Sequence, residues 1–473
     1  MVDKAREVAL KTLYRINNEG AYSNIALDEE ISKNAQKLNA KDIGLISEIV
    51  YGVITWKLTI DEIIKKYSKI RLKKISPWIL DILRLSIYQI VFLDKIPKSA
   101  AVNEGVNLAK RYGHRSSSGF ANAILRKVEK QDYEDFKNIK DEKERLSKQY
   151  SMPLWIIEEL MGEGLELEKI EEICISSNIR PKVSIRINTL KTNKEDLKHI
   201  LENENIKATD GILKDFLVLD KAKNIEKLES FKNGLFTVQD EAAGLTSLIL
   251  DPKKGESILD ACSSPGGKTT YIAQLVENEG QIIAFDIHEH RTRLVEQNAK
   301  RLGVNIIETK VQDASKFEEK YVNKFDKILL DVPCLGIGVL KRKPDIKWQK
   351  KKEDVKEISE IQYKILENCT KYLKPKGELV YSTCSILKEE NENLIKRFLQ
   401  KNKEFKLEKI ENIEEEFFKK YLKNEQFLQV YQNKKTDGFF ICKLFKKWNI
   451  TFVLQLYYGY IKCIDFLLNK YKI

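Results

Sequence analysis

The sequence predicts a multidomain protein: an all-α bundle over residues 1–130, a small α+β domain over 150–240, and a Rossmann-like α/β domain with a mostly parallel sheet over 241–446. Three observations lead to this prediction. A chain of 473 residues is too long for one ordinary hydrophobic core. Apolar residues recur at helical spacing in the first part of the chain. Short apolar runs alternate with amphipathic helices in the last part.

The first 130 residues are expected to be entirely helical. Apolar residues follow the helical period in AREVALKTLYRI (5–16) and in ISPWILDILRLSIYQIVFL (75–93). Residues 131–149 are dense in charge and are expected to form a solvated connecting helix. Residues 150–240 mix short helices with short strands, such as KVSIRIN (182–188).

From about residue 240 the pattern changes to that of a parallel sheet with crossover helices. Four apolar runs each end in small or polar residues: SILDA (257–261), IIAFDI (282–287), DKILLDVPC (326–334) and GELVYSTC (377–384). Sheets of this kind bind ligands at the carboxyl ends of their strands. The residues that end these runs are therefore the first candidates for a functional site.

The last stretch, residues 447–473, is apolar but is interrupted by Lys462 and Asp465. A helix that spans a membrane needs about 20 mostly apolar residues, so this stretch is marginal for that role. A packed or loosely attached tail is the preferred interpretation over a membrane anchor.

Composition limits the classes of protein and partner. Hydrophobic content is 42% and charged content 33%, values typical of a soluble globular chain rather than a disordered one. The net charge of +12 and the pI near 9.0 suit a polyanionic partner, most simply nucleic acid. A general enrichment in Lys, Ile and Asn would raise the pI without any such partner. No membrane association is expected, and a monomer is the default.

The cysteines suggest neither disulfides nor a metal. Seven are scattered along the chain with no CxxC pair and no Cys/His cluster, which favours neither a disulfide framework nor a zinc site. The initial residues MVDKAREVAL contain no apolar signal core, so we predict a cytoplasmic protein with reduced thiols.

The segment ILDACSSPGGKTT (258–270) joins a strand to a helix through small residues and is the candidate cofactor turn. Pro265 cannot continue a strand, and Gly266 and Gly267 allow the backbone to approach a ligand closely. The start of the next helix offers free amides to an anionic group. A phosphate-binding P-loop would require glycine at position 262, which is cysteine, and this alternative is disfavoured.

Three carboxylates follow successive predicted strands. Asp286 lies 20 residues after Gly266, the spacing at which a carboxylate typically binds ribose hydroxyls. Asp313 is placed to contact an adenine edge, and Asp331 ends a further strand. Each alone is more simply a solvated strand end or helix cap, but together they favour an adenosine-containing cofactor. The missing GxGxxG fingerprint argues against NAD and leaves S-adenosylmethionine as the better candidate.

Cys334 and Cys384 finish two of the predicted strands and lie beside polar residues, so an inert apolar role is less attractive for them. Two thiols suit methylation of carbon 5 of a cytosine, which is a poor nucleophile by itself. A thiolate that adds to carbon 6 makes carbon 5 reactive toward a sulfonium methyl group, and the proton on carbon 5 must then leave. Asp331 is placed to act as an acid near ring nitrogen 3, a role that would require a raised pKa.

Several motifs together resemble the RNA cytosine-5 methyltransferases of the NOL1/NOP2/Sun family, especially its bacterial Sun (Fmu, RsmB-type) branch. They are CSSPGGK (262–268), FDIHEHR (285–291), VQDA (311–314), DVPCLGIGVLKRKPDIKW (331–348) and YSTCS (381–385), with TVQDEAA (237–243) typical of that branch. The similarity covers about residues 1–446. It implies methylation of 16S ribosomal RNA at cytosine 967 with S-adenosylmethionine as cofactor.

The resemblance also implies roles for individual residues. Cys384 matches the nucleophile and Cys334 the cysteine that assists product release. Leu335 stands where a small Ser is common, which affects the expected shape of the turn rather than the chemistry. The implied cofactor contacts are Cys262, Ser263, Ser264, Pro265, Gly266, Gly267, Lys268, Asp286, Asp313 and Asp331.

The first 130 residues separately resemble the NusB-type RNA-binding fold, mainly through residues 96–128. Residues 150–240 resemble the family's small RNA-holding domain. RNA is therefore the expected partner. Two basic clusters are candidates for phosphate contacts: Arg71, Lys73 and Lys74, and the run Lys341, Arg342 and Lys343 after the DVPC motif. A solvated surface is the alternative for each.

The target base must leave its stack to reach a thiol. Trp348 or Tyr381 is placed to stack on it, unless either belongs to the core. Two alternative functions stay open. One is cytosine-5 methylation of transfer RNA or of another ribosomal site, and the other is a non-catalytic NusB-like RNA-binding factor.

Overall fold

The computed structural model describes residues 2–220 and 224–447. Contacts divide the chain into two compact units. Within the described residues, the first unit contains residues 2–181, Val339–Lys352 and Gln432–Lys434, and the second contains Lys182–Gly338, Glu353–Tyr431 and residues 435–447. The chain therefore leaves the second unit after Gly338, four residues beyond Cys334, and re-enters it at Glu353.

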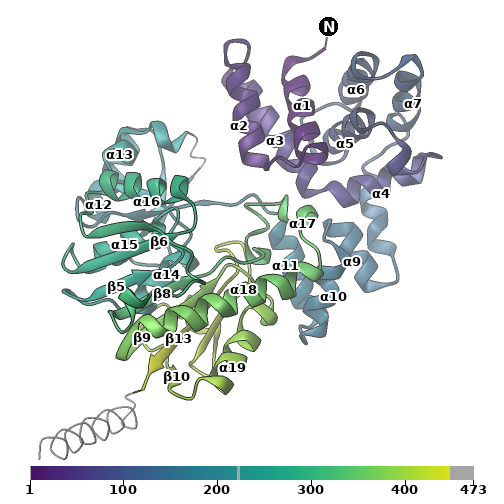
Figure 1. Cartoon of the computed structure of the whole chain (residues 1–473). Helices are drawn as coiled ribbons and strands as arrows, with labels where there is room; N and C mark the ends of the chain where they lie inside the picture. Colours follow the sequence, from purple (N-terminus) through teal and green to yellow (C-terminus); the bar gives the residue numbers. More distant parts are fainter. Residues whose placement is uncertain (1, 221–223, 448–473) are drawn as a thin grey trace, which may run out of the picture. The chain divides into compact units, whose positions relative to one another are not determined.

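Every regular element described in the first unit is a helix, which confirms the all-α bundle (Figure 1). α5 is buried on nearly all of its faces and forms the centre of the hydrophobic core. The ends follow local rules: the Asp3 side chain accepts from the amide of Arg6 at the start of α1, and Pro77 opens α5. The bundle helices are α1 (Lys4–Asn18), α2 (Ser23–Lys33), α3 (Ala40–Thr55), α4 (Lys57–Tyr67), α5 (Pro77–Phe92), α6 (Lys98–Tyr112) and α7 (Arg115–Leu125).

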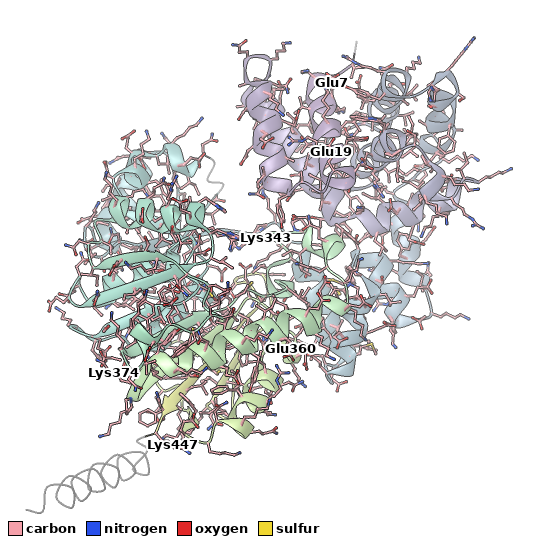
Figure 2. All side chains as sticks on the ribbon, in the orientation of Figure 1. Glu7, Glu19, Lys343, Glu360, Lys374 and Lys447 are labelled. Carbon is pink, nitrogen blue, oxygen red and sulfur yellow. The ribbon has the colours of Figure 1, made fainter. Side chains whose placement is uncertain are left out.

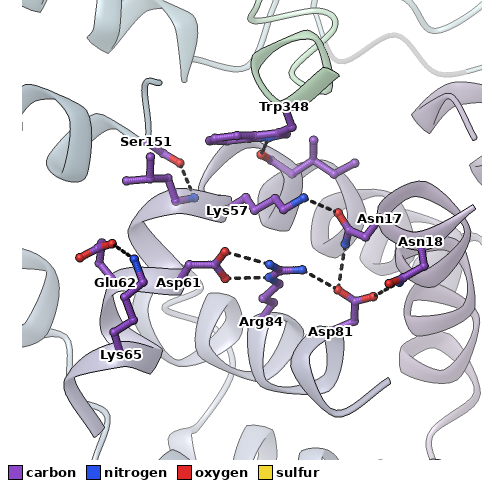
Figure 3. Close-up of polar contacts among 12 residues, drawn as sticks. Asn17, Asn18, Lys57, Asp61, Glu62, Lys65, Asp81, Arg84, Ser151 and Trp348 are labelled. Atoms are coloured by element: carbon purple, nitrogen blue, oxygen red, sulfur yellow. Dashed lines mark hydrogen bonds and ion pairs between the residues drawn. The ribbon is translucent and has the colours of Figure 1, made fainter. Parts of the chain in front are cut away.

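A network of buried and half-buried polar side chains crosses this bundle (Figure 3). The Arg84 guanidinium donates to both carboxylate oxygens of Asp61, at 2.7 and 2.8 Å, and to Asp81 at 3.0 Å. Asn17 also donates to Asp81, and Lys57 donates to the side-chain oxygen of Asn17, each at 2.8 Å. These bonds offset the cost of burying the charges and fix α1, α4 and α5 relative to one another.

The segment Val339–Lys352 packs within the first unit although its flanking residues belong to the second. It contains the short helix α17 (Ile346–Gln349). The Trp348 indole donates to the carbonyl of Ile54 at 2.7 Å, as Figure 3 shows, and the buried Lys347 ammonium donates to Asn178 at 2.7 Å. Polar contacts to α3 and to Asn178, both distant in the sequence, therefore hold the segment in place.

The charged stretch after the bundle is more broken than expected. Instead of one connecting helix over 131–149, the chain forms three pieces: α8 (Gln131–Glu134), a 3-10 turn (Asp135–Asn138) and α9 (Glu142–Tyr150). Helices α10 (Leu154–Gly162) and α11 (Leu167–Ser177) follow within the first unit. The contacts thus separate these two helices from the strands that follow them, whereas the sequence grouped all of 150–240. The domain boundaries stay predictions.

The second unit begins with a four-stranded antiparallel sheet in the order β2-β3-β1-β4. This sheet confirms the small α+β part, and its strand β1 lies inside the predicted run 182–188. Leucine, isoleucine and phenylalanine side chains on one side of the sheet form its core with α12. The elements are β1 (Val183–Ile187), α12 (Lys194–Asn203), β2 (Ala208–Asp210), β3 (Phe216–Leu219), α13 (Glu229–Lys232) and β4 (Phe236–Val238).

A larger sheet of nine strands follows, with its path in the order β11-β12-β13-β9-β8-β5-β6-β7 and β10 paired to β13. Five neighbouring strands are parallel, as predicted: β5 (Ser257–Asp260), β6 (Gln281–Asp286), β7 (Ile307–Val311), β8 (Phe325–Asp331) and β9 (Leu373–Thr383). The chain then adds antiparallel strands at one edge: β10 (Phe405–Glu408), β11 (Leu422–Lys423), β12 (Phe427–Val430) and β13 (Phe439–Lys446).

Helices cover both faces of the large sheet (Figure 1). Successive strand residues alternate between two cores: Leu259 and Leu330 pack with α18 and α19, and Ile258 and Leu329 pack with α14, α15 and α16. This alternation explains why the strands read as continuous apolar runs. The helices are α14 (Glu241–Leu250), α15 (Gly267–Leu275), α16 (Glu289–Leu302), α18 (Glu353–Cys369) and α19 (Glu392–Lys401).

Among the described residues, no single helix has the length and apolarity to cross a membrane; α3 and α4 meet those criteria only as a pair, bent by 76°. The apolar tail predicted for 447–473 lies, from residue 448, outside the described residues.

Candidate active site

The candidate site lies at the carboxyl ends of the parallel strands. β5 pairs with β6 on one side and with β8 on the other, so the chain progresses in opposite directions from β5. This is the switch point at which open parallel sheets leave a crevice for ligands. In the register of β8 with β9, Asp331 lies directly opposite Ser382. The two predicted cysteine motifs therefore emerge side by side.

The turn between β5 and α15 is shaped by its own backbone. The amide and the hydroxyl of Ser263 both donate to the carbonyl of Phe285, at 2.9 Å each, which ties the turn to β6. Gly266 has φ +98°, a value that favours glycine, and a Cβ there would lie 3.2 Å from Val295. Because α15 starts at Gly267, its first amides face outward from the turn.

Lys268 links this turn to the end of β8. Its ammonium lies 2.6 Å from Asp331 Oδ2, and Ser382 donates its hydroxyl to Asp331 Oδ1 at 2.9 Å. Lys268 also lies over the ring of Phe439 at 5.1 Å. Burial disfavours its charged form, but the carboxylate of Asp331 outweighs burial and raises the pKa of Lys268. Both oxygens of Asp331 thus accept hydrogen bonds, which fix the orientation of its side chain.

The sulfurs of Cys334 and Cys384 lie 2.9 Å apart, within hydrogen-bonding distance. The neighbouring Cys384 thiol, together with burial, raises the pKa of Cys334 well above its usual range. The thiolate form of Cys334 is therefore disfavoured, and its S–H is available to donate to the sulfur of Cys384.

Asp286 and Asp313 both lie at this edge, and each caps its own turn. Asp286 Oδ1 accepts from the amide of His288 at 3.1 Å. Asp313 Oδ1 accepts from the amide and the hydroxyl of Ser315, at 3.0 and 2.7 Å. Neither residue is a helix cap, because His288 is the N-cap of α16 and no described helix begins at Ser315. This local bonding involves one oxygen of each carboxylate. It does not conflict with a ligand role for the second oxygen.

The residues present fit the adenosine-containing methyl donor that the sequence suggested. Gln239 donates no hydrogen bond from its buried amide nitrogen to any described residue. This nitrogen would lie 3.7 Å from a Cβ at Gly267, so a donor faces the turn beside the start of α15. Such donors suit the carboxylate of an amino acid moiety, and Asp286 and Asp313 suit hydroxyl and amino groups.

Cys262 differs from the other expected cofactor contacts. Its side chain packs against the apolar core, and burial raises the pKa of its thiol well above the usual range. A contact with a cofactor would therefore come from its backbone. Asp260, which the sequence did not single out, ends β5 beside it. The Asp260 carboxylate is buried, accepts from Thr269 at 2.6 Å, and has a pKa raised to about 6 by burial.

Both aromatic residues suggested for stacking on a base make contacts within the protein. Tyr381 is fully buried and donates its hydroxyl to the carbonyl of Glu390 at 2.7 Å. Trp348 is held within the first unit by its bond to Ile54. Both belong to packed structure, the alternative considered for each, because contacts distant in sequence surround them.

In the two basic clusters considered for phosphate contacts, some side chains are half-buried and others are exposed. Lys341 is half-buried and donates to the carbonyl of Asn433 at 3.1 Å, and Arg342 is also half-buried. Lys343, labelled in Figure 2, is exposed. Arg71, Lys73 and Lys74 are exposed on a loop of the first unit. Phosphate contacts remain predictions, now with Lys343 as the best placed member of its run.

Three family models match successive parts of the chain. Residues 247–445 match the model of the 16S rRNA methyltransferase RsmB/F family, residues 3–130 match the NusB family, and residues 152–226 match the ferredoxin-like domain of RsmF/B-like methyltransferases. The chain is 36% identical over 444 residues to the probable ribosomal RNA small subunit methyltransferase B of Bacillus subtilis, covering 93% of this chain and 98% of that protein. It is 32% identical over 415 residues to ribosomal RNA small subunit methyltransferase B of Escherichia coli, covering 87% and 92%.

Two solved structures are similar to the chain in fold. The crystal structure of PH0851 covers 94% of this chain and 99% of that one, with a TM-score of 0.76 and 28% identity. NSun6 from Pyrococcus horikoshii with SFG covers 62% and 98%, with a TM-score of 0.55 and 25% identity.

Proposed function

Because the chain belongs to the 16S rRNA methyltransferase RsmB/F family, we propose that it methylates carbon 5 of cytosine 967 in 16S ribosomal RNA, using S-adenosylmethionine and a covalent adduct between Cys384 and carbon 6 of the base. One observation carries the proposal: the sulfurs of Cys334 and Cys384, from separate chain segments, lie 2.9 Å apart at the carboxyl edge of the sheet.

Cys384 acts first, as a thiolate. Its sulfur forms a bond to carbon 6 of the cytosine, and the electron pair of the 5,6 double bond makes carbon 5 nucleophilic. The S–H of Cys334 and the positive charge of Lys268 stabilise the thiolate, since Lys268 is close enough for Cys384 to help raise the pKa of Lys268. Hydrogen bonds and opposite charges of this kind favour the ionised form of a thiol.

Asp331 orients the base. The sequence suggested an acid that donates to ring nitrogen 3, but Lys268 and Ser382 both donate to this carboxylate. We propose instead that Asp331 accepts a hydrogen bond from the 4-amino group of cytosine. Uracil has a carbonyl oxygen at this position, so an acceptor here selects cytosine. Lys268 remains the charged donor of the pair.

Cys334 completes the reaction. While Cys384 is free, its sulfur raises the pKa of Cys334. Once Cys384 is bonded to carbon 6, this effect disappears and Cys334 loses its proton to solvent more readily. The Cys334 thiolate then accepts the proton from carbon 5, the bond from carbon 6 to sulfur breaks, and Cys384 leaves as a thiolate.

The bound methyl donor supplies an electrophilic methyl group. In our proposal the backbone of Cys262–Lys268 and the amide of Gln239 hold its amino acid end, and Asp286 and Asp313 hold the ribose hydroxyls and the adenine edge. The fold then serves to present carbon 5 of the adduct to this site.

RNA is the proposed partner, with Lys343 and the Arg71 loop as phosphate contacts. A cytoplasmic location follows from the chemistry proposed, because two adjacent catalytic thiols must stay reduced. We propose that the protein acts as a monomer.

Bisulfite sequencing of total RNA tests the substrate. A strain that lacks the protein should lose a single 5-methylcytosine, at position 967 of 16S ribosomal RNA, and the intact gene should restore it whereas a Cys384→Ala variant should not. Loss of a methylcytosine in transfer RNA or at another ribosomal position would contradict the proposed site. An unchanged methylation pattern would favour a non-catalytic RNA-binding factor.

A further inference from the structure

One buried carboxylate connects the two cysteine motifs. Glu390, in the 3-10 turn Lys388–Glu390, is fully buried. Its Oε2 accepts from the backbone amide of Leu335 at 2.9 Å, and its Oε1 accepts from the hydroxyl of Ser385. Leu335 directly follows Cys334, and Ser385 directly follows Cys384. A single side chain therefore fixes the residue after each cysteine.

The residues before the cysteines are held by neighbours of Glu390. Gln362, on α18, donates its amide to Glu390 Oε2 at 3.0 Å and to the carbonyl of Pro333 at 2.9 Å. Thr383 donates its hydroxyl to the side chain of Asn391 at 2.6 Å. Both cysteines are thus bracketed by bonds that converge on Glu390 and its neighbours.

A carboxylate is a costly residue to bury, and an apolar side chain of similar size would avoid that cost. Here three donors from three chain segments surround it, so the charge is satisfied. Packing alone does not require such an arrangement. Holding two loops at a fixed separation does, because each bond specifies a distance and a direction.

We propose that Glu390 is a positioning residue that sets the separation of the two cysteine sulfurs through the residues that follow them. This inference rests on the proposed roles of Cys334 and Cys384 for its consequence in catalysis, but the positioning itself does not depend on them. Its negative charge also helps to raise the pKa of Cys334, an effect secondary to those of Cys384 and burial.

The test measures the separation of the sulfurs independently of methylation. Diamide joins two adjacent thiols, which lose two hydrogen atoms as diamide is reduced to the hydrazine, and peptide mass mapping reports the Cys334–Cys384 disulfide. The full chain is compared as wild type, Glu390→Ala, Glu390→Gln and Glu389→Ala. The neighbouring Glu389 is the matched control, because among the described residues its carboxylate accepts only a long bond, 3.4 Å, from the side chain of Asn393.

We expect Glu390→Ala to slow disulfide formation by at least tenfold and the single-turnover rate of methyl transfer by about 100-fold, with the Kd for S-adenosylmethionine unchanged. Glu390→Gln should recover most of both rates, because its oxygen can accept from Leu335 and Gln362 while the Ser385 hydroxyl reverses to accept from its amide. Glu389→Ala should match the wild type.

If Glu390→Ala does not fold, Ser385→Ala can replace it, because this variant removes only the bond between the Ser385 hydroxyl and Glu390. It should slow disulfide formation and methyl transfer in the same way but to a smaller extent. Disulfide formation at the wild-type rate in Glu390→Ala, or in Ser385→Ala if that variant replaces it, would overturn the positioning role. Slower disulfide formation with normal methyl transfer would uphold that role and contradict the proposed function of the cysteines instead.

Discussion

Lys347 provides a quantitative test of how the segment Val339–Lys352 is held in the first unit. Its side chain is 1% exposed, and burial lowers its pKa to about 7 from the ordinary 10.5. The unfolded chain therefore binds more protons than the folded unit between these two values. Stability should rise with pH through this window and be lost as the pH falls toward 7.

The magnitude follows from the two pKa values. Raising the pH from 7 to 9 should stabilise the folded unit by about 2 kcal/mol through Lys347 alone. Lys57, whose pKa burial lowers to about 8, adds to the same trend. A comparison between variants is therefore needed to isolate the contribution of Lys347. In Lys347→Met the rise in unfolding free energy from pH 7 to pH 9 should be smaller by about 2 kcal/mol. Lys343→Met, on the exposed part of the same segment, is the matched control and should leave the increase unchanged.

Urea unfolding at the two pH values, followed by tryptophan fluorescence, is the appropriate assay. Four of the five tryptophans lie in the first unit, so the signal reports mainly on it; they are Trp56, Trp78, Trp155 and Trp348. An equal rise of the unfolding free energy with pH in the wild type and in Lys347→Met would refute the reasoning.

Three further variants test other parts of the site. Lys268→Met should lower the single-turnover rate of methyl transfer by about 100-fold, because it removes the charge beside Asp331 and Cys384; a rapid-quench assay would show this, and a normal rate would exclude the role. Arg186→Met should weaken S-adenosylmethionine binding by about tenfold in calorimetry, because the buried guanidinium donates to Thr270 at 3.0 Å and to the carbonyl of Gly267 at the start of α15. An unchanged Kd would contradict this role of Arg186. Lys343→Ala should lower the slope of log K for RNA binding against log salt by about 1, and an unchanged slope would remove Lys343 from the phosphate contacts.

Much of the fold was predictable because the local pattern and the final burial agree. The runs at 257–261, 282–287 and 326–334 became parallel strands, since both faces of each are covered by helices. The antiparallel strands after β9 were not predicted. β13 pairs with β9, whose residues lie about 60 positions earlier, and no local signal records that pairing.

The site was predictable where function demands unusual residues at strand ends, as with Gly266, Cys334 and Cys384. Glu390 could not be found in this way, because it stands in the run KEENEN (388–393), which has the composition of a solvated surface. Only the folded chain buries it. The role of Trp348 was ambiguous because its hydrogen-bond partner, the carbonyl of Ile54, lies 294 residues away in sequence.

The central claim is that the two cysteines act on one cytosine from a shared site, Cys384 by bonding to it and Cys334 by releasing it. Denaturing gel electrophoresis of each variant after incubation with S-adenosylmethionine and labelled 16S ribosomal RNA tests this directly. Cys334→Ala should accumulate a protein–RNA adduct that survives denaturation, and Cys384→Ala should form none. An adduct in Cys384→Ala, or normal turnover without an adduct in Cys334→Ala, would contradict the account.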